Sequence, residues 1–245
     1  MPATSTTPLV KPGPLQPRPL VYKESDGKPM AETDKHRRAI IYLIEALSLH
    51  FAAQPDVYVS GNNFVHYQEG NTKAYVSPDV YVVFGVENRA RDFYKVWEEG
   101  GRTPAVVFEI TSKSTQDEDT GRKRRIYEQV LRVPEYLLFD PTGDYLRPRL
   151  QGYGLVEGQY VPSVMENDRL HSDLLNLDLE VQGEVLRLYD PVTGRYLPTL
   201  SEEHERAEQA EERAEQAEER AEQERARAER LVARLRELGV SEEEA

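Results

Sequence analysis

The chain has 245 residues, no cysteine and a formal net charge of −13, with 44 Asp and Glu against 31 Lys and Arg. This composition excludes a disulfide framework, a thiolate zinc site and a cysteine nucleophile, and the acidic balance argues against a protein that coats nucleic acid with a basic surface. Since no apolar run approaches the roughly 18 residues of a membrane helix and residues 1–20 lack the apolar core of a signal peptide, we expect a cytoplasmic protein.

Proline dominates the beginning of the chain, where residues 1–20 contain six prolines. Proline lacks a backbone donor and restricts φ, so we predict a disordered leader, with a proline-rich docking ligand as the alternative. A folded domain is predicted for residues 21–200. It opens with an amphipathic helix from Asp34 to Phe51, capped by Thr33 or Asp34. The apolar stripe of this helix consists of Ile40, Leu43, Ile44, Leu47 and Phe51.

Five segments bounded by turn residues are predicted to be strands: 57–60, 64–67, 80–84, 105–108 and 136–139. The last three are continuous apolar runs, which are typical of central strands covered on both faces. A second helix is predicted over residues 119–132. Two hairpins follow, pairing 150–154 with 159–161 and 186–189 with 196–200. This order predicts an α/β fold with a mixed sheet flanked by helices.

Residues 201–245 form a separate charged helix with a seven-residue repeat, and they carry 16 acidic and 8 basic residues. Heptad position a holds Ala207, Ala214, Ala221, Ala228 and Leu235, and position d holds Ala210, Ala217, Glu224, Leu231 and Leu238. This pattern predicts a coiled-coil seam, although alanine buries little area in its first half. The alternative is a solvated single helix held by Glu–Arg pairs.

Two carboxylates occur next to the predicted central strands. Glu109 is the one charged residue of the apolar segment 104–110, where a carboxylate is costly unless a cation or donors compensate it. It is either a metal ligand or catalytic acid, or a strand-end residue that emerges into solvent. Asp79 follows Pro78 at the entrance of the strand 80–84. The alternative to a role as ligand is that Asp79 only forms the turn at this entrance.

Lys123 is the one base on the apolar side of the second predicted helix. At 100° per residue it shares a face with Ile126, Tyr127 and Val130. The alternative is a lysine that extends its ammonium into solvent from a helix end. Two carboxylates on neighbouring strands with an inward lysine suit metal-assisted hydrolysis of a phosphodiester, with Mg²⁺ as the ion and Mn²⁺ as a substitute.

The ordered motifs resemble a known nuclease pattern. Pro78-Asp79, 29 further residues and then Glu109-Ile110-Thr111-Ser112 resemble the PD-(D/E)XK nucleases, and more specifically the Uma2 family of restriction endonucleases. Further matching pieces are residues 25–34 with His36, 77–80, 108–115, Lys123 with Tyr127, and 134–141. The resemblance covers roughly residues 20–200 and implies a restriction-endonuclease-like fold.

The resemblance also implies roles for individual residues. Thr111 stands where the superfamily has a lysine, and Lys123 matches the lysine that the family supplies from the next helix, with Lys113 as the alternative. His36 lies within the apolar stripe of the first helix and is an accessory candidate, together with Lys113 and Tyr127, whereas Glu45 lies outside that stripe.

These features predict a Mg²⁺-dependent endonuclease in which Asp79 and Glu109 hold the metal and Lys123 assists catalysis. DNA is the expected substrate and RNA the alternative, with Arg122, Arg124 and Arg125 contacting the phosphate backbone. A homodimer is expected through the fold or through the C-terminal helix. The alternatives are a catalytically inactive nucleic-acid-binding or regulatory module on a nuclease fold, and a coiled-coil assembly protein.

Overall fold

The structure is a computed structural model and describes residues 21–22 and 33–237 of the chain. The predicted leader at 1–20 and the motif at 25–32 lie outside the described residues. No helix in the described part of the chain is long and apolar enough to span a lipid bilayer.

The elements follow one another in the order α1 (Asp34–His50), β1 (Val57–Ser60), β2 (Val65–His66), β3 (Tyr75–Val76), β4 (Val80–Phe84), β5 (Tyr94–Lys95), β6 (Val106–Ile110), η1 (Glu118–Lys123), η2 (Ile126–Leu131), β7 (Glu135–Phe139), β8 (Leu150–Val156), β9 (Gln159–Pro162), β10 (Met165–Glu166), β11 (Arg169–Ser172), β12 (Leu177–Gln182), β13 (Val185–Asp190), β14 (Arg195–Tyr196) and α2 (Leu200–Glu237). The predicted α/β class with helices beside a mixed sheet is confirmed.

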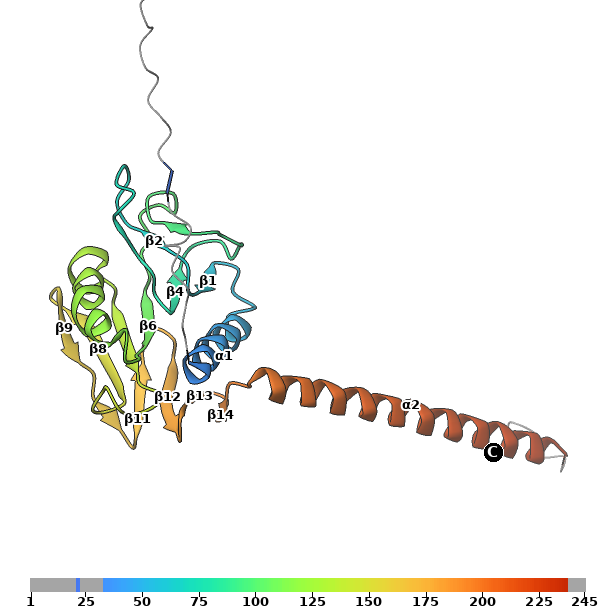
Figure 1. Cartoon of the computed structure of the whole chain (residues 1–245). Helices are drawn as coiled ribbons and strands as arrows, with labels where there is room; N and C mark the ends of the chain where they lie inside the picture. Colours follow the sequence, from blue (N-terminus) through green and yellow to red (C-terminus); the bar gives the residue numbers. More distant parts are fainter. Residues whose placement is uncertain (1–20, 23–32, 238–245) are drawn as a thin grey trace, which may run out of the picture.

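A six-stranded sheet in the order β1-β4-β6-β7-β8-β9 forms the centre of the fold (Figure 1). Strands β6 and β7 pair in parallel, and the other neighbours pair antiparallel. The continuous apolar runs of β4, β6 and β7 occupy its middle, as predicted, because both faces of these strands are covered. The predicted hairpin of β8 and β9 extends the sheet to its edge.

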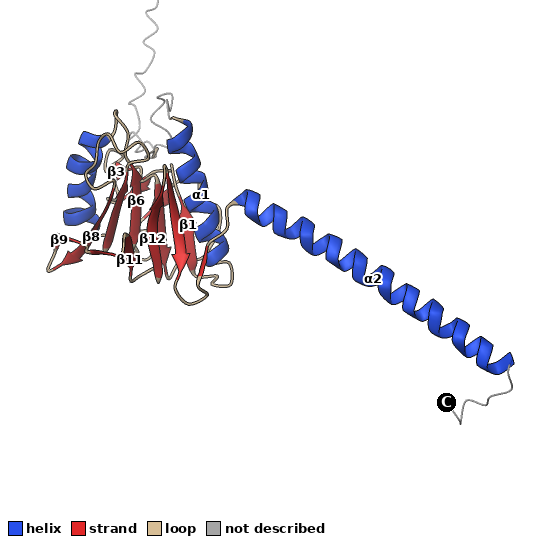
Figure 2. Cartoon of the chain, turned by 90° about the horizontal axis from the view of Figure 1, so that it is seen from below, coloured by secondary structure: helices blue, strands red, loops and turns tan. Residues whose placement is uncertain are grey.

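Helices and further strands cover both faces of this sheet (Figure 2). On one face, α1 and the five-stranded sheet β10-β11-β12-β13-β14 enclose a core that includes Val106, Phe108 and Ile110. On the opposite face, η1, η2 and the three-stranded sheet β3-β2-β5 enclose a second core that includes Val107 and Tyr127. Alternate residues of β6 therefore enter different cores, as period-two alternation predicts.

The first helix begins and ends within one residue of its predicted bounds. The Thr33 side chain accepts a hydrogen bond from the His36 amide at 3.3 Å, which is the expected geometry of an N-cap. Buried residues recur along the stripe that faces the sheet and include Ile40, Leu43 and Leu47, while Glu45 is exposed. The cap therefore places His36 in the first turn of a helix whose register is set by the core.

The second predicted helix spans residues 116–131 but is wound largely as a π-helix in η1 and η2. Its buried residues, Asp119, Lys123, Tyr127 and Leu131, recur every four positions. The α-helical period places Val130 on this face, and that prediction is wrong because Val130 is 54% exposed. The wider winding puts Leu131 there instead.

Several further segments differ from the predictions. Strands β3, β5 and β10–β12 were not predicted, because most are short and their apolar residues pack on distant segments. The predicted strand 196–200 ends at Tyr196. Thr199 and Glu202 stop it by forming a capping box, in which the Glu202 amide donates to Thr199 Oγ1 at 3.2 Å and the Thr199 amide donates to Glu202 Oε2 at 2.8 Å. Helix α2 therefore begins at Leu200.

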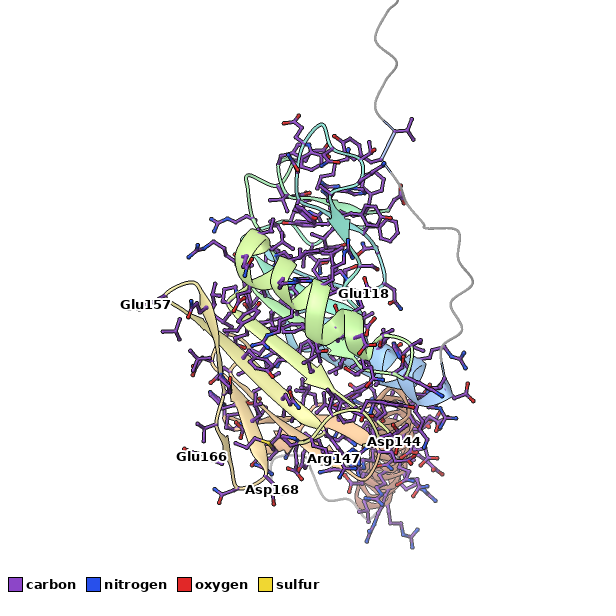
Figure 3. All side chains as sticks on the ribbon, turned by 60° about the vertical axis from the view of Figure 1, so that its left-hand side comes forward. Glu118, Asp144, Arg147, Glu157, Glu166 and Asp168 are labelled. Atoms are coloured by element: carbon purple, nitrogen blue, oxygen red, sulfur yellow. The ribbon has the colours of Figure 1, made fainter. Side chains whose placement is uncertain are left out.

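Asp140 fixes the loop that follows β7. Its fully buried carboxylate accepts hydrogen bonds from the amide and hydroxyl of Thr142 at 2.9 and 2.8 Å, and from the amides of Tyr145 and Leu146 at 2.6 and 3.0 Å. Burial raises the pKa of this carboxyl, but the amide donors more than offset burial and hold the pKa below its ordinary value. The neighbouring Asp144 is exposed on the same loop (Figure 3).

We expect Asp140→Ala to lower the free energy of unfolding by about 3 kcal/mol at neutral pH, because buried amides lose a charged acceptor. A carboxyl with a depressed pKa stabilises the fold above its unfolded pKa of about 3.9, and this contribution fades as the pH falls through the folded pKa. The deficit should therefore shrink toward pH 3, as measured by urea unfolding, while Asp144→Ala should match the unmodified protein. A deficit that does not change with pH would contradict this account.

Candidate active site

Two carboxylates meet at one end of strands β4 and β6. These strands pair antiparallel with Val80 opposite Phe108, so the next position of that register sets Asp79 opposite Glu109. The Ile110 amide donates to Oδ2 of Asp79 at 2.7 Å and ties the two strand ends together. Sheet pairing therefore brings together two acids that lie 30 positions apart in the chain.

A glycine allows the chain to pass close to Asp79. A Cβ atom at Gly61 would lie 2.1 Å from the carbonyl oxygen of Asp79, and the adjacent Asn62 amide donates to the Pro78 carbonyl at 3.0 Å. Any side chain at position 61 would push this strand entrance away. The turn at 61–62 thus holds the backbone of Asp79, and the Ile110 amide holds its carboxylate.

Glu109 lies completely buried beneath the second helix. Its Oε2 accepts from the Lys123 ammonium at 2.7 Å, and its Oε1 accepts from the Tyr127 hydroxyl at 2.6 Å. Lys123 also lies 3.2 Å from Oδ1 of Asp119, another fully buried acid. One lysine therefore bridges two carboxylates that belong to different elements.

The winding of the helix makes this bridge possible. Positions 119, 123 and 127 are four apart, and an α-helix rotates 40° away from alignment over each such step. A wider turn removes this drift, so the three side chains stack along one line facing β6. Stretches of π-helix occur frequently at functional sites. Asp119 was not predicted as a site residue, and its spacing of four from Lys123 is the signal that could have identified it.

His36 contacts the other carboxylate of the pair. Its Nε2 lies 3.5 Å from Oδ2 of Asp79, and the side chain is almost fully buried in the first turn of α1. Burial raises the pKa of Asp79, but the hydrogen bond from His36 and the charge of Lys123 more than offset burial and hold the pKa below its ordinary value. Asp79 is therefore an ionised carboxylate at neutral pH.

The other titratable groups of the site shift in the opposite direction. Burial raises the pKa of Glu109 well above its ordinary value, despite the opposing charge of Lys123. Burial likewise raises the pKa of Asp119. Burial lowers the pKa of Lys123, but Glu109 and the two aspartates outweigh burial and raise it. The lysine therefore keeps its proton while three acids surround it.

A cleft of about 520 Å³ opens above this group. His36, Asp79, Thr111 and Lys123 contribute to its lining, whereas Glu109 lies below Lys123 and does not reach the cleft. Thr111 is buried, and its Oγ1 has no hydrogen-bond partner among the described residues. The deep part of the cleft thus presents an ionised carboxylate, an ammonium group and an unsatisfied hydroxyl.

The rim of the cleft is basic on the side of the second helix. Lys113 and Arg122 are exposed and contribute to its lining, together with Glu118, which pairs with Arg122 at 2.9 Å. Arg124 instead lies over the ring of Tyr153 at 4.3 Å, and Arg125 is exposed outside the lining. The structure therefore brings one of the three predicted phosphate-binding arginines to the cleft and leaves the other two outside it.

The residues at this site suit a hard divalent cation. In the part of the chain that the structure describes, no three His, Asp or Glu side chains are arranged to hold a metal ion together. Mg²⁺, however, commonly binds to one or two carboxylates and keeps several waters. Asp79 and Glu109 supply such oxygens, the single lysine does not balance three acids, and the free hydroxyl of Thr111 faces the same cleft.

Comparisons with known proteins show which family the chain resembles. A family model described as "Uma2: Putative restriction endonuclease" matches residues 15–188. Among solved structures, the crystal structure of "a putative nuclease belonging to DUF820" from Anabaena variabilis aligns with a TM-score of 0.47 at 12% identity. That alignment covers 67% of this chain and 92% of the other. None of the curated proteins matches the chain.

We expect Lys123→Met to lower the free energy of unfolding by about 3–5 kcal/mol, because it leaves Glu109 and Asp119 buried without their cation. Adding Glu109→Gln should recover part of this loss, since the amide carries no charge. Urea unfolding of the two single variants and the double variant measures the coupling. Arg125→Met, at an exposed position of the same helix, should change little, and purely additive effects at 109 and 123 would refute the coupling.

Proposed function

We propose, from the premise that this chain belongs to the Uma2 family of restriction endonucleases, that it is a Mg²⁺-dependent endonuclease that hydrolyses phosphodiester bonds of DNA in this cleft. One observation carries the proposal: Asp79 and Glu109 meet at one strand end with the ammonium of Lys123 beside them. Two acids and one cation on adjacent elements match the requirements of metal-assisted phosphoryl chemistry.

Asp79 and Glu109 would hold the metal. When bound, Mg²⁺ polarises the phosphate and lowers the pKa of a coordinated water. Asp79 is suited to this role because its carboxylate faces the cleft and stays ionised beside His36. Glu109 would be the second ligand through Oε2, which here accepts from Lys123, and the Tyr127 hydroxyl that donates to Oε1 would orient its carboxylate.

Lys123 would stabilise negative charge on the phosphate. Because the surrounding carboxylates raise its pKa, it keeps its proton and acts as a fixed positive charge rather than as a general base. Asp119 would act as a positioning residue, since it lies 3.2 Å from the lysine on the side of its own helix. The ammonium therefore has a second carboxylate partner besides Glu109.

The basic rim would contact the nucleic acid backbone. Lys113 and Arg122 extend over the cleft, so their charges attract phosphate even though the whole chain is acidic. RNA carries the same phosphates and is the alternative substrate, which a comparison of matched DNA and RNA strands would distinguish. DNA as substrate fits the cytoplasmic location predicted from the sequence.

A second candidate function is a non-catalytic nucleic-acid-binding module on a nuclease fold. One observation favours it, because Lys123 and Tyr127 occupy both oxygens of Glu109 and leave this acid beneath the cleft lining. Titration with Mn²⁺ separates the two functions. Binding that is lost in Asp79→Asn and in Glu109→Gln supports the nuclease, and absence of binding supports the second candidate.

We expect Asp79→Asn and Glu109→Gln each to lower Mg²⁺-dependent cleavage of plasmid DNA by at least about 100-fold, because each removes a charged ligand of the metal. Circular dichroism should show that both variants remain folded. Glu45→Gln, at an exposed position of α1, should cleave like the unmodified protein. Cleavage that persists in both site variants would refute the proposal.

Arg122 and Arg125 provide a matched pair on one helix. We expect Arg122→Ala to weaken DNA binding uniformly across sequences and to reduce the slope of log affinity against log salt by about 0.9, because one phosphate contact is lost. Arg125→Ala should leave both quantities unchanged, since this side chain lies outside the cleft lining. Fluorescence anisotropy at several salt concentrations measures them, and equal effects of the two variants would exclude this cleft as the contact surface.

A further inference from the structure

Helix α2 extends away from the folded body (Figures 1 and 2), and Glu202 in its first turn pairs with Arg187 of β13. Its 38 residues correspond to about 57 Å of helix. Apolar residues of the heptad seam lie open to solvent, among them Leu200 at 68% and Leu231 at 56% exposure. In the described part of the chain, nothing covers this seam.

Within α2, Arg206 pairs with Glu203 at 3.5 Å, but Arg213, Glu211 and Glu218 have no residue of opposite charge at helical spacing. Helical neighbours lie three and four positions away, and for Arg213 these positions hold Gln209, Ala210, Gln216 and Ala217. Glu211 and Glu218 have glutamates as their charged neighbours at this spacing, which repel them. Glu–Arg pairs therefore do not support the segment 207–220 as a solvated single helix.

The same charges form a regular pattern on the two flanks of the seam. Heptad position g holds Arg206, Arg213, Arg220, Arg227 and Arg234, and position e holds His204, Glu211, Glu218, Arg225 and Val232. In a parallel, in-register coiled coil, each g residue faces the e residue of the following heptad in the other strand. Arg206 then faces Glu211 of the second copy, and Arg213 faces Glu218, so symmetry gives four attractive pairs.

In an antiparallel coiled coil, each flank of one helix faces the same flank of the other helix. Position g then faces g, so arginine meets arginine along the helix, and the two glutamates at e face position e of the other strand. Like charges across an interface cost free energy and select against that arrangement. The parallel arrangement has one repulsive contact type, between Arg220 and Arg225, against its two attractive ones.

We propose that α2 forms a parallel, in-register, two-stranded coiled coil with a second copy of this chain. The charged flanks determine the orientation, the alanines allow close approach in the first half, and Leu231 buries apolar area in the second. Because α2 begins three residues after β14, the two folded bodies lie at the same end of the coil. The pairing does not depend on the proposed nuclease activity.

A cross-linking experiment on the full chain tests orientation and register, because the chain contains no cysteine of its own. We expect Ala210→Cys to form a covalent dimer on mild oxidation, since equivalent d positions face each other only in the parallel, in-register arrangement. Glu212→Cys, at the outer f position, should remain monomeric under the same conditions. Equal cross-linking of both variants, or none of Ala210→Cys, would overturn the proposal.

Charge reversal tests whether the charges at positions e and g stabilise the parallel pairing. The full chain with Arg206→Glu and Arg213→Glu, and the full chain with Glu211→Arg and Glu218→Arg, should each dimerise at least about tenfold more weakly than the unmodified protein by analytical ultracentrifugation. An equimolar mixture should recover the dimer, because glutamate at g of the first variant then faces arginine at e of the second, and arginine at g of the second faces glutamate at e of the first. An unmodified chain that is monomeric at about 100 μM, or a mixture no tighter than its components, would refute the proposal.

Discussion

The burial of Glu109 is the constraint on which the site depends. A carboxylate at the end of a fully covered strand is too costly without a cation and donors, and Lys123 and Tyr127 supply them from the helix that follows. This requirement fixes how the second helix lies on β6. It also explains why that helix departs from α-helical winding, since Asp119, Lys123 and Tyr127 must face the same strand.

The same constraint links stability to chemistry. The lysine that neutralises Glu109 in the folded chain is the group that would stabilise a phosphate, and the acid that it neutralises would become a metal ligand. Asp119 offers the ammonium a second partner at the spacing of one helical turn. Thr111, the residue after β6, is buried with an unsatisfied hydroxyl, and the cation beside it comes from the second helix.

Charged side chains are compensated differently in the folded body and in helix α2. In the body, charges that matter are buried and compensated by partners in the same chain, as with Asp140 and its four donors. In α2, charges recur on the surface at heptad spacing, and Arg213 has no residue of opposite charge three or four positions away in its own helix. The net negative charge of the chain therefore does not indicate the local charge of the cleft, whose rim is basic at Lys113 and Arg122.

The sequence by itself determined the central strands, because continuous apolar runs such as 80–84 require cover on both faces, and it identified Asp79, Glu109 and Lys123 as the unusual polar residues of those segments. It also predicted α1 with its Thr33 cap, since caps and periodicity are local signals. Only the tertiary structure decided that Asp79 lies opposite Glu109, because strand register depends on pairing between distant segments. Packing on β6 likewise decided the helix winding, which buried Asp119 and exposed Val130 against the α-helical period.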